Sequence, residues 1–175
     1  MANAGNAVSP LRFRPLSRSD ALTLMSWRYP APYSAYDLDS QEPAVLAELL
    51  RPENSYHAIL HSDEIIGFFC LGPDARIPGW NYDDSALDLG MGLRPDWTGQ
   101  GKGYGCLIAV LALVESESPG RALRATVLAW NLRAVRVCQR AGFRPVATFK
   151  KKDEGDGCVV LLRKSSWLGE TLTVQ

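Results

Sequence analysis

Residues 87–105, Leu87-Asp-Leu-Gly-Met-Gly-Leu-Arg-Pro-Asp-Trp-Thr-Gly-Gln-Gly-Lys-Gly-Tyr-Gly105, lead into the apolar run Cys106-Leu-Ile-Ala-Val-Leu-Ala-Leu-Val114. Apolar residues alternate up to Pro95, and glycines follow at positions 99, 101, 103 and 105. This pattern predicts a strand, a glycine-rich loop and a buried helix. Because the first turn of a helix has N–H groups without partners inside the helix, the loop and helix start form a candidate anion site.

Two common nucleotide-binding loops do not fit this stretch. A Walker A loop needs glycine five residues before Gly-Lys and serine or threonine after it, whereas Asp96 and Gly103 occupy these positions. The dinucleotide pattern Gly-x-Gly-x-x-Gly, started at 99, 101 or 103, meets Tyr104, Cys106 or Ile108 at its third glycine. A glycine-rich turn without a ligand is the structural alternative.

The stretch resembles motif A of the GCN5-related N-acetyltransferase (GNAT) family, in which a strand ends in Val-x-Pro and Arg/Gln-x-x-Gly-x-Gly/Ala precedes a helix. Leu93-Arg-Pro95 corresponds to the strand end, and Thr98 then falls at the Arg/Gln position. A second register places Gln100 there instead. The resemblance implies that the loop amides bind the pyrophosphate of coenzyme A, and Lys102 is placed to add a cation.

A second segment, Trp130-Asn-Leu-Arg-Ala-Val-Arg-Val-Cys-Gln-Arg-Ala-Gly-Phe143, resembles motif B of the same family, in which Asn contacts the pantetheine arm. Asn131, Ala134, Gly142 and Phe143 match in place. Taken alone, they are a helix cap, a packing residue and a helix end. The resemblance implies that the cofactor is acetyl-coenzyme A, bound by Met91, Gly92, Leu93, Thr98, Gly99, Gln100, Gly101, Lys102, Gly103, Tyr104, Asn131 and Ala134.

The rest of the chain matches the family's order of elements, β-α-α-β-β-β-α-β-α-β-β. Further strands are predicted at 11–15, 56–61, 65–71, 123–128, 145–151 and 158–164, and further helices at 20–28, 43–51 and 131–141. Prolines at 30 and 32 argue against a helix in 27–36. The expected fold is α/β (α+β), a mixed, mostly antiparallel central sheet of six to seven strands flanked by about four helices.

Length and composition limit the protein class. We expect one domain over 11–165, a flexible lead at 1–10 and a tail at 166–175. Lysine plus arginine equal aspartate plus glutamate at 19 each, which argues against nucleic-acid and membrane partners. The apolar run 106–114 is too short to span a bilayer and no secretory leader is apparent, so a cytoplasmic protein is expected. The oligomeric state is left open, and a homodimer is one possibility.

The cysteines and histidines do not predict a metal site. Cysteines occur at 70, 106, 138 and 158 without a C-x-x-C pair, so we expect reduced, mostly buried thiols. His57 and His61 lie on one face of a predicted strand and do not form a metal site by themselves.

In the family, a bulge separates the central strand from its neighbour, and a backbone amide polarises the thioester. Here this amide would lie within 90–93, where Gly90 and Gly92 fit a bulge or close ligand approach. The alternative is glycine packing under bulky neighbours.

Two catalytic candidates follow. Cys138 occupies the position at which the family often has tyrosine. Three roles are open for it: a chemically inert packing residue, the acid that protonates the leaving thiolate, or a nucleophile. Asp88 is a candidate base, because burial would raise its pKa, and the alternative is a carboxylate that orients substrate or bonds a neighbouring loop.

Aromatic residues are concentrated in two segments that face the acceptor side in the family. The candidate acceptor-binding residues are Trp27, Tyr33, Tyr36, Trp80 and Tyr82. Tyr29 is a further aromatic residue of the first segment. These aromatic residues predict a small or medium-sized amine as acceptor. The alternative is that these rings only close the core over the sheet. The leading hypothesis is direct transfer of acetyl from acetyl-coenzyme A to a primary amine. The alternatives are a non-catalytic acyl-coenzyme A binding protein, a nucleotide-binding interaction module, and a protein or peptide N-acetyltransferase.

Overall fold

A computed structural model describes residues 10–152 and 155–165 of the 175-residue chain. The predicted lead, except for its last residue, and the predicted tail lie outside the described residues. The strands are Arg12–Pro15 (β1), His57–His61 (β2), Glu64–Leu71 (β3), Leu87–Leu93 (β4), Leu123–Leu128 (β5), Arg144–Lys150 (β6) and Gly157–Arg163 (β7). The helices are Arg18–Ser26 (α1), Pro43–Leu49 (α2), Gly103–Glu117 (α3) and Leu132–Arg140 (α4). The predicted order of elements is confirmed.

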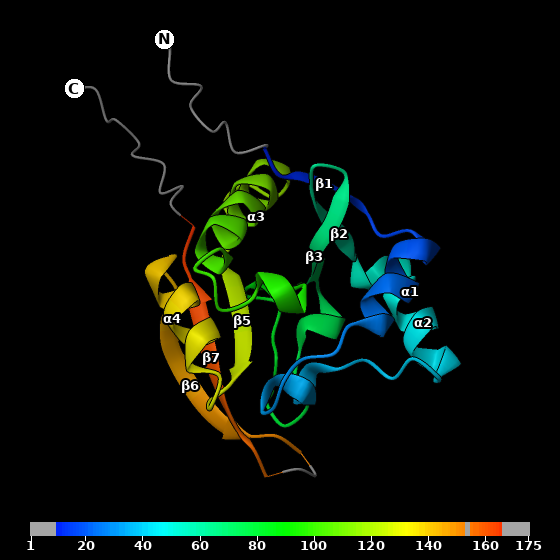
Figure 1. Ribbon diagram of the computed structural model, residues 1–175. Coiled ribbons are helices and arrows are strands. Elements are labelled where there is room, and N and C mark those ends of the chain that lie inside the picture. Colours follow the sequence, from blue (N-terminus) through cyan, green and yellow to red (C-terminus); the bar gives the residue numbers. More distant parts are fainter. Residues whose placement is uncertain (1–9, 153–154, 166–175) are drawn as a thin grey trace, which may run out of the picture.

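The seven strands form one sheet in the order β1-β2-β3-β4-β5-β7-β6 (Figure 1). Every neighbouring pair is antiparallel except β4 and β5, which are parallel. This confirms the predicted mixed, mostly antiparallel sheet. Helix α4 packs on β5, β6 and β7, whereas α1 and α2 pack on each other beside the other half of the sheet (Figure 1).

Strand β4 pairs unequally with its two neighbours. Its register with β3 runs without a shift from Gly67 opposite Leu93 to Leu71 opposite Leu89. Its pairing with β5 ends after two pairs, the second being Asp88 opposite Arg124. The two strands therefore separate beyond Asp88. The expected bulge in β4 is absent from this register, so the expectation was wrong on this point, although the separation that it was meant to explain is present.

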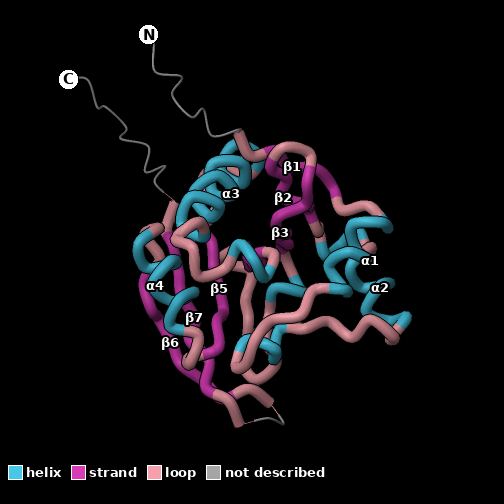
Figure 2. The backbone as a smooth tube through the Cα atoms, viewed as in Figure 1, coloured by secondary structure: helices cyan, strands magenta, loops and turns pink. Residues whose placement is uncertain are grey.

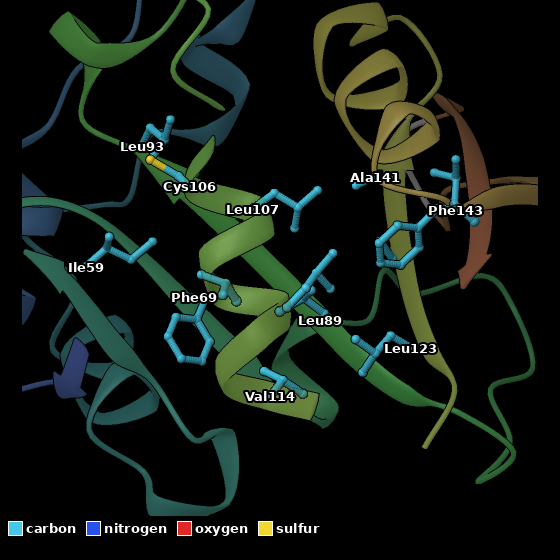
Figure 3. Packing of buried hydrophobic residues seen from close by; sticks show 14 of the residues in the cluster. Ile59, Phe69, Leu89, Leu93, Cys106, Leu107, Val114, Leu123, Ala141 and Phe143 are labelled. Atoms are coloured by element: carbon cyan, nitrogen blue, oxygen red, sulfur yellow. The ribbon is translucent and has the colours of Figure 1, made fainter. Parts of the chain in front are cut away.

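The core lies between the sheet and α3. Buried α3 residues recur at helical spacing, namely Cys106, Leu107, Val110, Leu111 and Val114. Figure 3 shows side chains of α3 directed at sheet residues such as Phe69 and Leu89. This packing fixes the start of α3 beside the open end of β4.

Between α1 and α2 the chain makes a long excursion, residues 27–38, which we call the strap. A capping box at Ser17 and Asp20 begins α1. The strap then extends toward the first turn of α4 and returns to α2 (Figure 2). The prediction of no α-helix in 27–36 is confirmed, but Tyr33–Tyr36 forms a 3₁₀ turn.

Candidate active site

A cavity of about 790 Å³ opens where β4 and β5 separate. Its walls are the open end of β4, the middle of β5, the glycine loop with the start of α3, one face of α4, and the strap. Segments far apart in the sequence thus meet around one space. The volume lies in the range of ligand-binding cavities.

The open edge of β4 presents backbone amides to this cavity. The N–H of Gly72 donates to the carbonyl of Asp88 at 2.9 Å, on the β3 side, whereas the N–H of Leu87 donates to Ala122 at 2.9 Å, on the β5 side. Because successive residues of a strand direct their backbone groups to opposite edges, odd-numbered residues face β5. Leu89, directly after the last β4–β5 pair, and Met91 are therefore the first residues beyond it whose amides face the β5 side, and Met91 lies two residues further into the opening.

The two glycines of β4 leave room for bulky neighbours in β3. A Cβ at Gly92 would lie 2.5 Å from the Phe68 ring, and one at Gly90 would lie 2.8 Å from the sulfur of Cys70. Gly90, Gly92 and Phe68 all line the cavity. The structure therefore matches the alternative in which the glycines pack under bulky neighbours. Because a glycine has no side chain, only backbone forms the cavity wall at these two positions.

The glycine loop forms a turn that leads directly into α3. Gly99 has φ +71° and Gly101 has φ +76°, which is the left-handed region that favours glycine. Helix α3 begins at Gly103 with no side-chain cap, so the amides of its first turn have no intrahelical partner and no capping side chain. These three glycines line the cavity together with Thr98 and Tyr104.

Two predicted cofactor residues of this loop lie outside the cavity lining. The side chain of Gln100 donates to the carbonyl of Asp96, and the ammonium of Lys102 lies 4.0 Å from the centre of the Trp97 ring. Thr98 donates its hydroxyl proton to Pro95 at 2.7 Å, which closes the turn before the glycines. The side chains of Thr98, Gln100 and Lys102 thus make contacts within the loop.

Helix α4 supplies the opposite wall. Asn131 caps it, since Oδ1 accepts from the amide of Ala134 at 3.2 Å, and both residues line the cavity as predicted. Arg133, Arg136 and Arg140 also line the cavity, and sequence reasoning did not select them. Their spacing of three and four residues was the available signal, since it places three cations on one helix face.

Cys138 also lines the cavity from α4. Its thiol is half-buried, and burial raises its pKa to about 11. No histidine is present among the described lining residues. The thiol is therefore protonated at neutral pH and lacks an adjacent base.

The strap closes the cavity with aromatic rings. Trp27, Tyr33 and Tyr36 line it, as predicted. Tyr33 and Tyr36 pack on Trp130 with ring centroids 5.5 and 5.7 Å away, and the guanidinium of Arg133 lies 3.7 Å from the centre of the Tyr33 ring. These contacts attach the strap to the start of α4.

Comparisons with known proteins agree with this geometry. Residues 10–144 match the family model described as an acetyltransferase (GNAT) domain. The chain belongs to the GNAT family. A search of curated protein sequences gave no match to this GNAT chain.

Solved structures with the same fold include an aminoglycoside acetyltransferase AAC(6')-Ib in complex with ribostamycin and coenzyme A. It has a TM-score of 0.69 at 16% identity, over 94% of this chain and 99% of that one. A spermidine N-acetyltransferase SpeG chimera from Vibrio cholerae and hSSAT gives 0.65 at 16%, over 89% and 96%. A GNAT acetyltransferase from Bacillus anthracis gives 0.68 at 13%, over 90% and 96%. The likeness confirms the GNAT fold.

Asp88 of this GNAT chain lies outside the cavity lining, in a buried ion-pair network. Its side chain is 2% exposed and accepts from Arg124 at 2.6 and 3.0 Å and from Arg76 at 2.7 Å. Arg124 also binds Asp83 at 2.8 Å. The second interpretation of Asp88, a carboxylate bonded to a neighbouring loop, describes this arrangement, because both of its oxygens accept hydrogen bonds from guanidinium groups.

Trp80 and Tyr82 also lie outside the cavity lining, in contrast to their predicted place at the acceptor. The hydroxyl of Tyr82 binds the backbone of Ile77 and donates to Thr126, whereas Trp80 stacks on Phe149 with centroids 6.5 Å apart. The hydroxyl of Tyr82 and the ring of Trp80 thus make their contacts within the protein. The loop that carries them supports β5 and β6 from outside the cavity.

Two strap residues join the predicted aromatics in the cavity lining. The hydroxyl of Tyr29 donates to the carbonyl of Leu93 at 2.8 Å, and its backbone N–H donates to Asp37 at 2.9 Å. Burial and, to a smaller extent, Asp37 raise the pKa of Tyr29 to about 12. Sequence reasoning missed Asp37, and its place beside four aromatic residues was the available signal.

Residues 10–152 and 155–165 offer neither a metal-binding cluster nor a membrane-spanning helix. In these ranges no group of three or more His, Cys, Asp or Glu side chains lies together in a way that would hold a metal ion. No helix in them is both long and apolar enough to cross a bilayer. The cysteines there are free thiols, three buried and one half-buried.

Proposed function

We propose that this GNAT chain transfers an acetyl group from acetyl-coenzyme A to the primary amine of a small or medium-sized molecule, without a covalent enzyme intermediate. One observation carries the proposal. A single cavity contains the uncapped start of α3, the free edge of β4 and an aromatic strap. Anion-binding, carbonyl-polarising and amine-binding groups therefore share one space.

The residues of the cavity fit coenzyme A in chemical type. The glycine turn and the unpaired amides of α3 suit a pyrophosphate, since they provide N–H donors and a positive helix end. Arg136 and Arg140 provide cations for phosphate on the facing helix. Asn131 and Ala134 offer a polar contact and a small side chain where the resemblance places the pantetheine arm.

Acetyl-coenzyme A would supply an activated thioester. In the transfer, the amine nitrogen forms a bond to the carbonyl carbon, the carbon–sulfur bond breaks, the amine loses a proton and the thiolate gains one. The amide of Met91 is the chain's donor for the negative charge that develops on the carbonyl oxygen. This role needs a fixed backbone, which the unbroken β3–β4 register provides.

Direct transfer is supported by the state of Cys138. A covalent route needs a thiolate and a base, whereas this thiol has a pKa of about 11 and no histidine neighbour among the described lining residues. We assign Cys138 as a protonated wall residue. The proton of the amine then leaves through water.

Small amines as acceptors are supported by the closed strap and by analogy. The aromatic side chains of the strap suit the apolar body and the charge of an amine. The structural relatives include acetyltransferases whose names state aminoglycosides or spermidine. At 16% identity these names support the size class of the acceptor only.

The replacement of the usual tyrosine by Cys138 favours one rival, a non-catalytic member that binds acyl-coenzyme A. Two experiments separate the possibilities. Calorimetry should detect binding of coenzyme A and of acetyl-coenzyme A but no binding of ATP. The rate of thiol release should rise when primary amines are added to the enzyme with acetyl-coenzyme A. Binding without thiol release over a broad amine panel would favour the rival, whereas release with peptides alone would favour a protein acetyltransferase. If neither coenzyme form binds, both assignments fail.

A further inference from the structure

We infer that Asp37 binds a second, cationic group of the acceptor, so that the acceptor of this GNAT chain is a diamine or polyamine. The inference rests on the proposed function and narrows its substrate class. One amine of such a molecule would react at the β4 edge, and an ammonium at its other end would lie against the strap.

Asp37 is the only carboxylate among the described residues that line the cavity. Its Oδ1 accepts the backbone N–H of Tyr29 at 2.9 Å, which fixes the side chain. Within residues 10–152 and 155–165, its other oxygen has no hydrogen bond or ion pair. A half-buried, oriented carboxylate with one free oxygen is suited to an ammonium donor.

The positively and negatively charged residues of the cavity come from different walls. The cations Arg133, Arg136 and Arg140 all come from α4, and Asp37 comes from the strap. The α4 side therefore attracts phosphate, and the strap side attracts a cation. Trp27, Tyr29 and Tyr36 line the same side, and aromatic faces add to the attraction for an ammonium. One face of the Tyr33 ring is already covered by the guanidinium of Arg133, 3.7 Å from its centre.

Tyr29 sets the distance between Asp37 and the reaction centre. Its backbone N–H binds Asp37, and its hydroxyl binds the carbonyl of Leu93 on the open edge of β4. Asp37 and the β4 edge therefore lie at opposite ends of one tyrosine residue. This separation fits an ammonium remote from the reacting amine better than a base in contact with it.

The chemistry of amine transfer allows this division of roles. The reacting nitrogen must be neutral to attack a carbonyl, whereas an alkyl ammonium with a pKa near that of lysine, about 10.4, stays charged at neutral pH. The remote ammonium keeps its charge throughout the reaction. Its pairing with Asp37 therefore acts on acceptor binding.

The test compares cadaverine with pentylamine, which share a carbon chain and differ by one ammonium. For the wild-type enzyme we expect kcat/KM to favour cadaverine. Asp37→Asn keeps an acceptor for the Tyr29 amide and removes the charge, so the cadaverine-to-pentylamine ratio should fall about tenfold. Asp39→Asn is the matched control, because Asp39 is exposed and lies outside the cavity lining, and its side chain accepts only the Gln41 amide, at 2.8 Å, among the described residues. Its ratio should equal that of the wild type.

An unchanged ratio in Asp37→Asn overturns the inference, including the case in which both rates fall together, since a general base would serve both amines. A second measurement separates this failure from failure of the proposed function. Cadaverine is titrated calorimetrically into protein saturated with coenzyme A, where no transfer occurs, and Asp37→Asn should bind it about tenfold more weakly. Weaker binding without thiol release from any amine would reject the enzyme and keep the Asp37 site. Thiol release with equal cadaverine affinity in both proteins would reject the site and keep the enzyme.

Discussion

Asn131 donates a hydrogen bond from its side-chain amide to the hydroxyl oxygen of Tyr36 at 3.0 Å, while its Oδ1 accepts the Ala134 amide at 3.2 Å. One side chain therefore fixes both the first turn of α4 and the strap. In the proposed function Asn131 contacts the pantetheine arm and the strap binds the acceptor, so the two binding regions would meet at this residue.

Tyr36→Phe tests this connection. The substitution removes the hydroxyl and keeps the ring contact with Trp130 at 5.7 Å. We expect the acceptor KM to rise about threefold to tenfold, because a strap that has lost its hydrogen bond binds the amine less well. Coenzyme A affinity, measured by calorimetry, should not fall, since the Asn131 cap on Ala134 stays. A loss of coenzyme A affinity with an unchanged acceptor KM would contradict this division.

The α4 arginines give a second prediction. Arg136 lines the cavity without an ion-pair or ring partner among the described residues, whereas Lys102 lies over Trp97 and outside the lining. Arg136→Ala should raise the dissociation constant of coenzyme A about fivefold to tenfold, and Lys102→Ala less than about twofold. Calorimetry at low and high salt should show the Arg136 effect shrinking as salt screens it. A larger effect of Lys102→Ala would reverse the assignment.

Local patterns were sufficient to predict the elements of the fold. The alternation before Pro95 and the apolar run after Gly105 identified β4 and α3, and the helix start moved only to Gly103. The strap differed because prolines exclude an α-helix but permit a 3₁₀ turn, which needs only bonds such as Asp37 N–H to Ser34 at 3.0 Å. The position of β7 between β5 and β6 was not predicted, since no local pattern specifies the order of strands in a sheet.

The site was less predictable, because partners distant in sequence decide what a polar side chain does. Asp88 meets Arg76 from 12 residues away and Arg124 from 36. No pattern around Asp88 indicates either arginine, so burial alone suggested a base. Backbone elements of the site were predictable, since glycine positions report backbone geometry directly.

Acid stability depends on the capping box that anchors α1. Burial of Asp20 opposes its ionisation, but hydrogen bonds from Arg14 and Ser17 outweigh it and lower its pKa from 3.8 to about 2. Because the folded pKa lies below the unfolded one, this carboxylate stabilises the protein above about pH 4, and the contribution is lost as pH falls toward 2. Asp20→Asn should therefore cost about 2 kcal/mol near neutral pH and progressively less below pH 4.

Thermal unfolding from about pH 6 to pH 2 measures this effect. The difference in midpoint between wild type and Asp20→Asn should narrow as the pH falls through this window. Asp84→Asn is the control, because Asp84 is exposed and should leave the midpoint unchanged across the range. If the unfolding midpoints of the wild type and Asp20→Asn differ by the same amount at every pH, the capping carboxylate is not the titrating group.

Cys138 distinguishes direct transfer from the two other roles that the sequence left open. Burial raises the pKa of the Cys138 thiol to about 11, so the thiol is protonated at pH 7, which argues against a nucleophile. The raised pKa also makes it a weaker acid than an ordinary thiol, whose pKa is about 8.5, which argues against a general acid. Cys138→Ala should therefore keep kcat within about threefold of the wild type, whereas loss of a general acid would cost about a hundredfold or more. Mass spectrometry of enzyme mixed with acetyl-coenzyme A alone should find no acetylated Cys138. An acetylated peptide containing Cys138, together with an inactive alanine variant, would establish a covalent route.

Gly101 provides the sharpest test of the cofactor loop, because the chain contains a matched glycine elsewhere. Gly101 has φ +76° and Gly120 has φ +79°, and a Cβ at either position would meet nothing within 4 Å. Alanine at each site should therefore destabilise the fold alike, by about 1–2 kcal/mol. Only Gly101 lines the cavity, whereas Gly120 follows the far end of α3.

We expect Gly101→Ala to weaken coenzyme A binding about tenfold, because its methyl group occupies the space in which the loop amides would meet the pyrophosphate. Gly120→Ala should bind coenzyme A like the wild type. Calorimetry for affinity and thermal unfolding for stability, run on both variants, separate a local steric effect from general destabilisation. If both variants lose affinity equally, backbone strain is the cause. If neither loses affinity while both remain folded, the pyrophosphate does not bind at this turn.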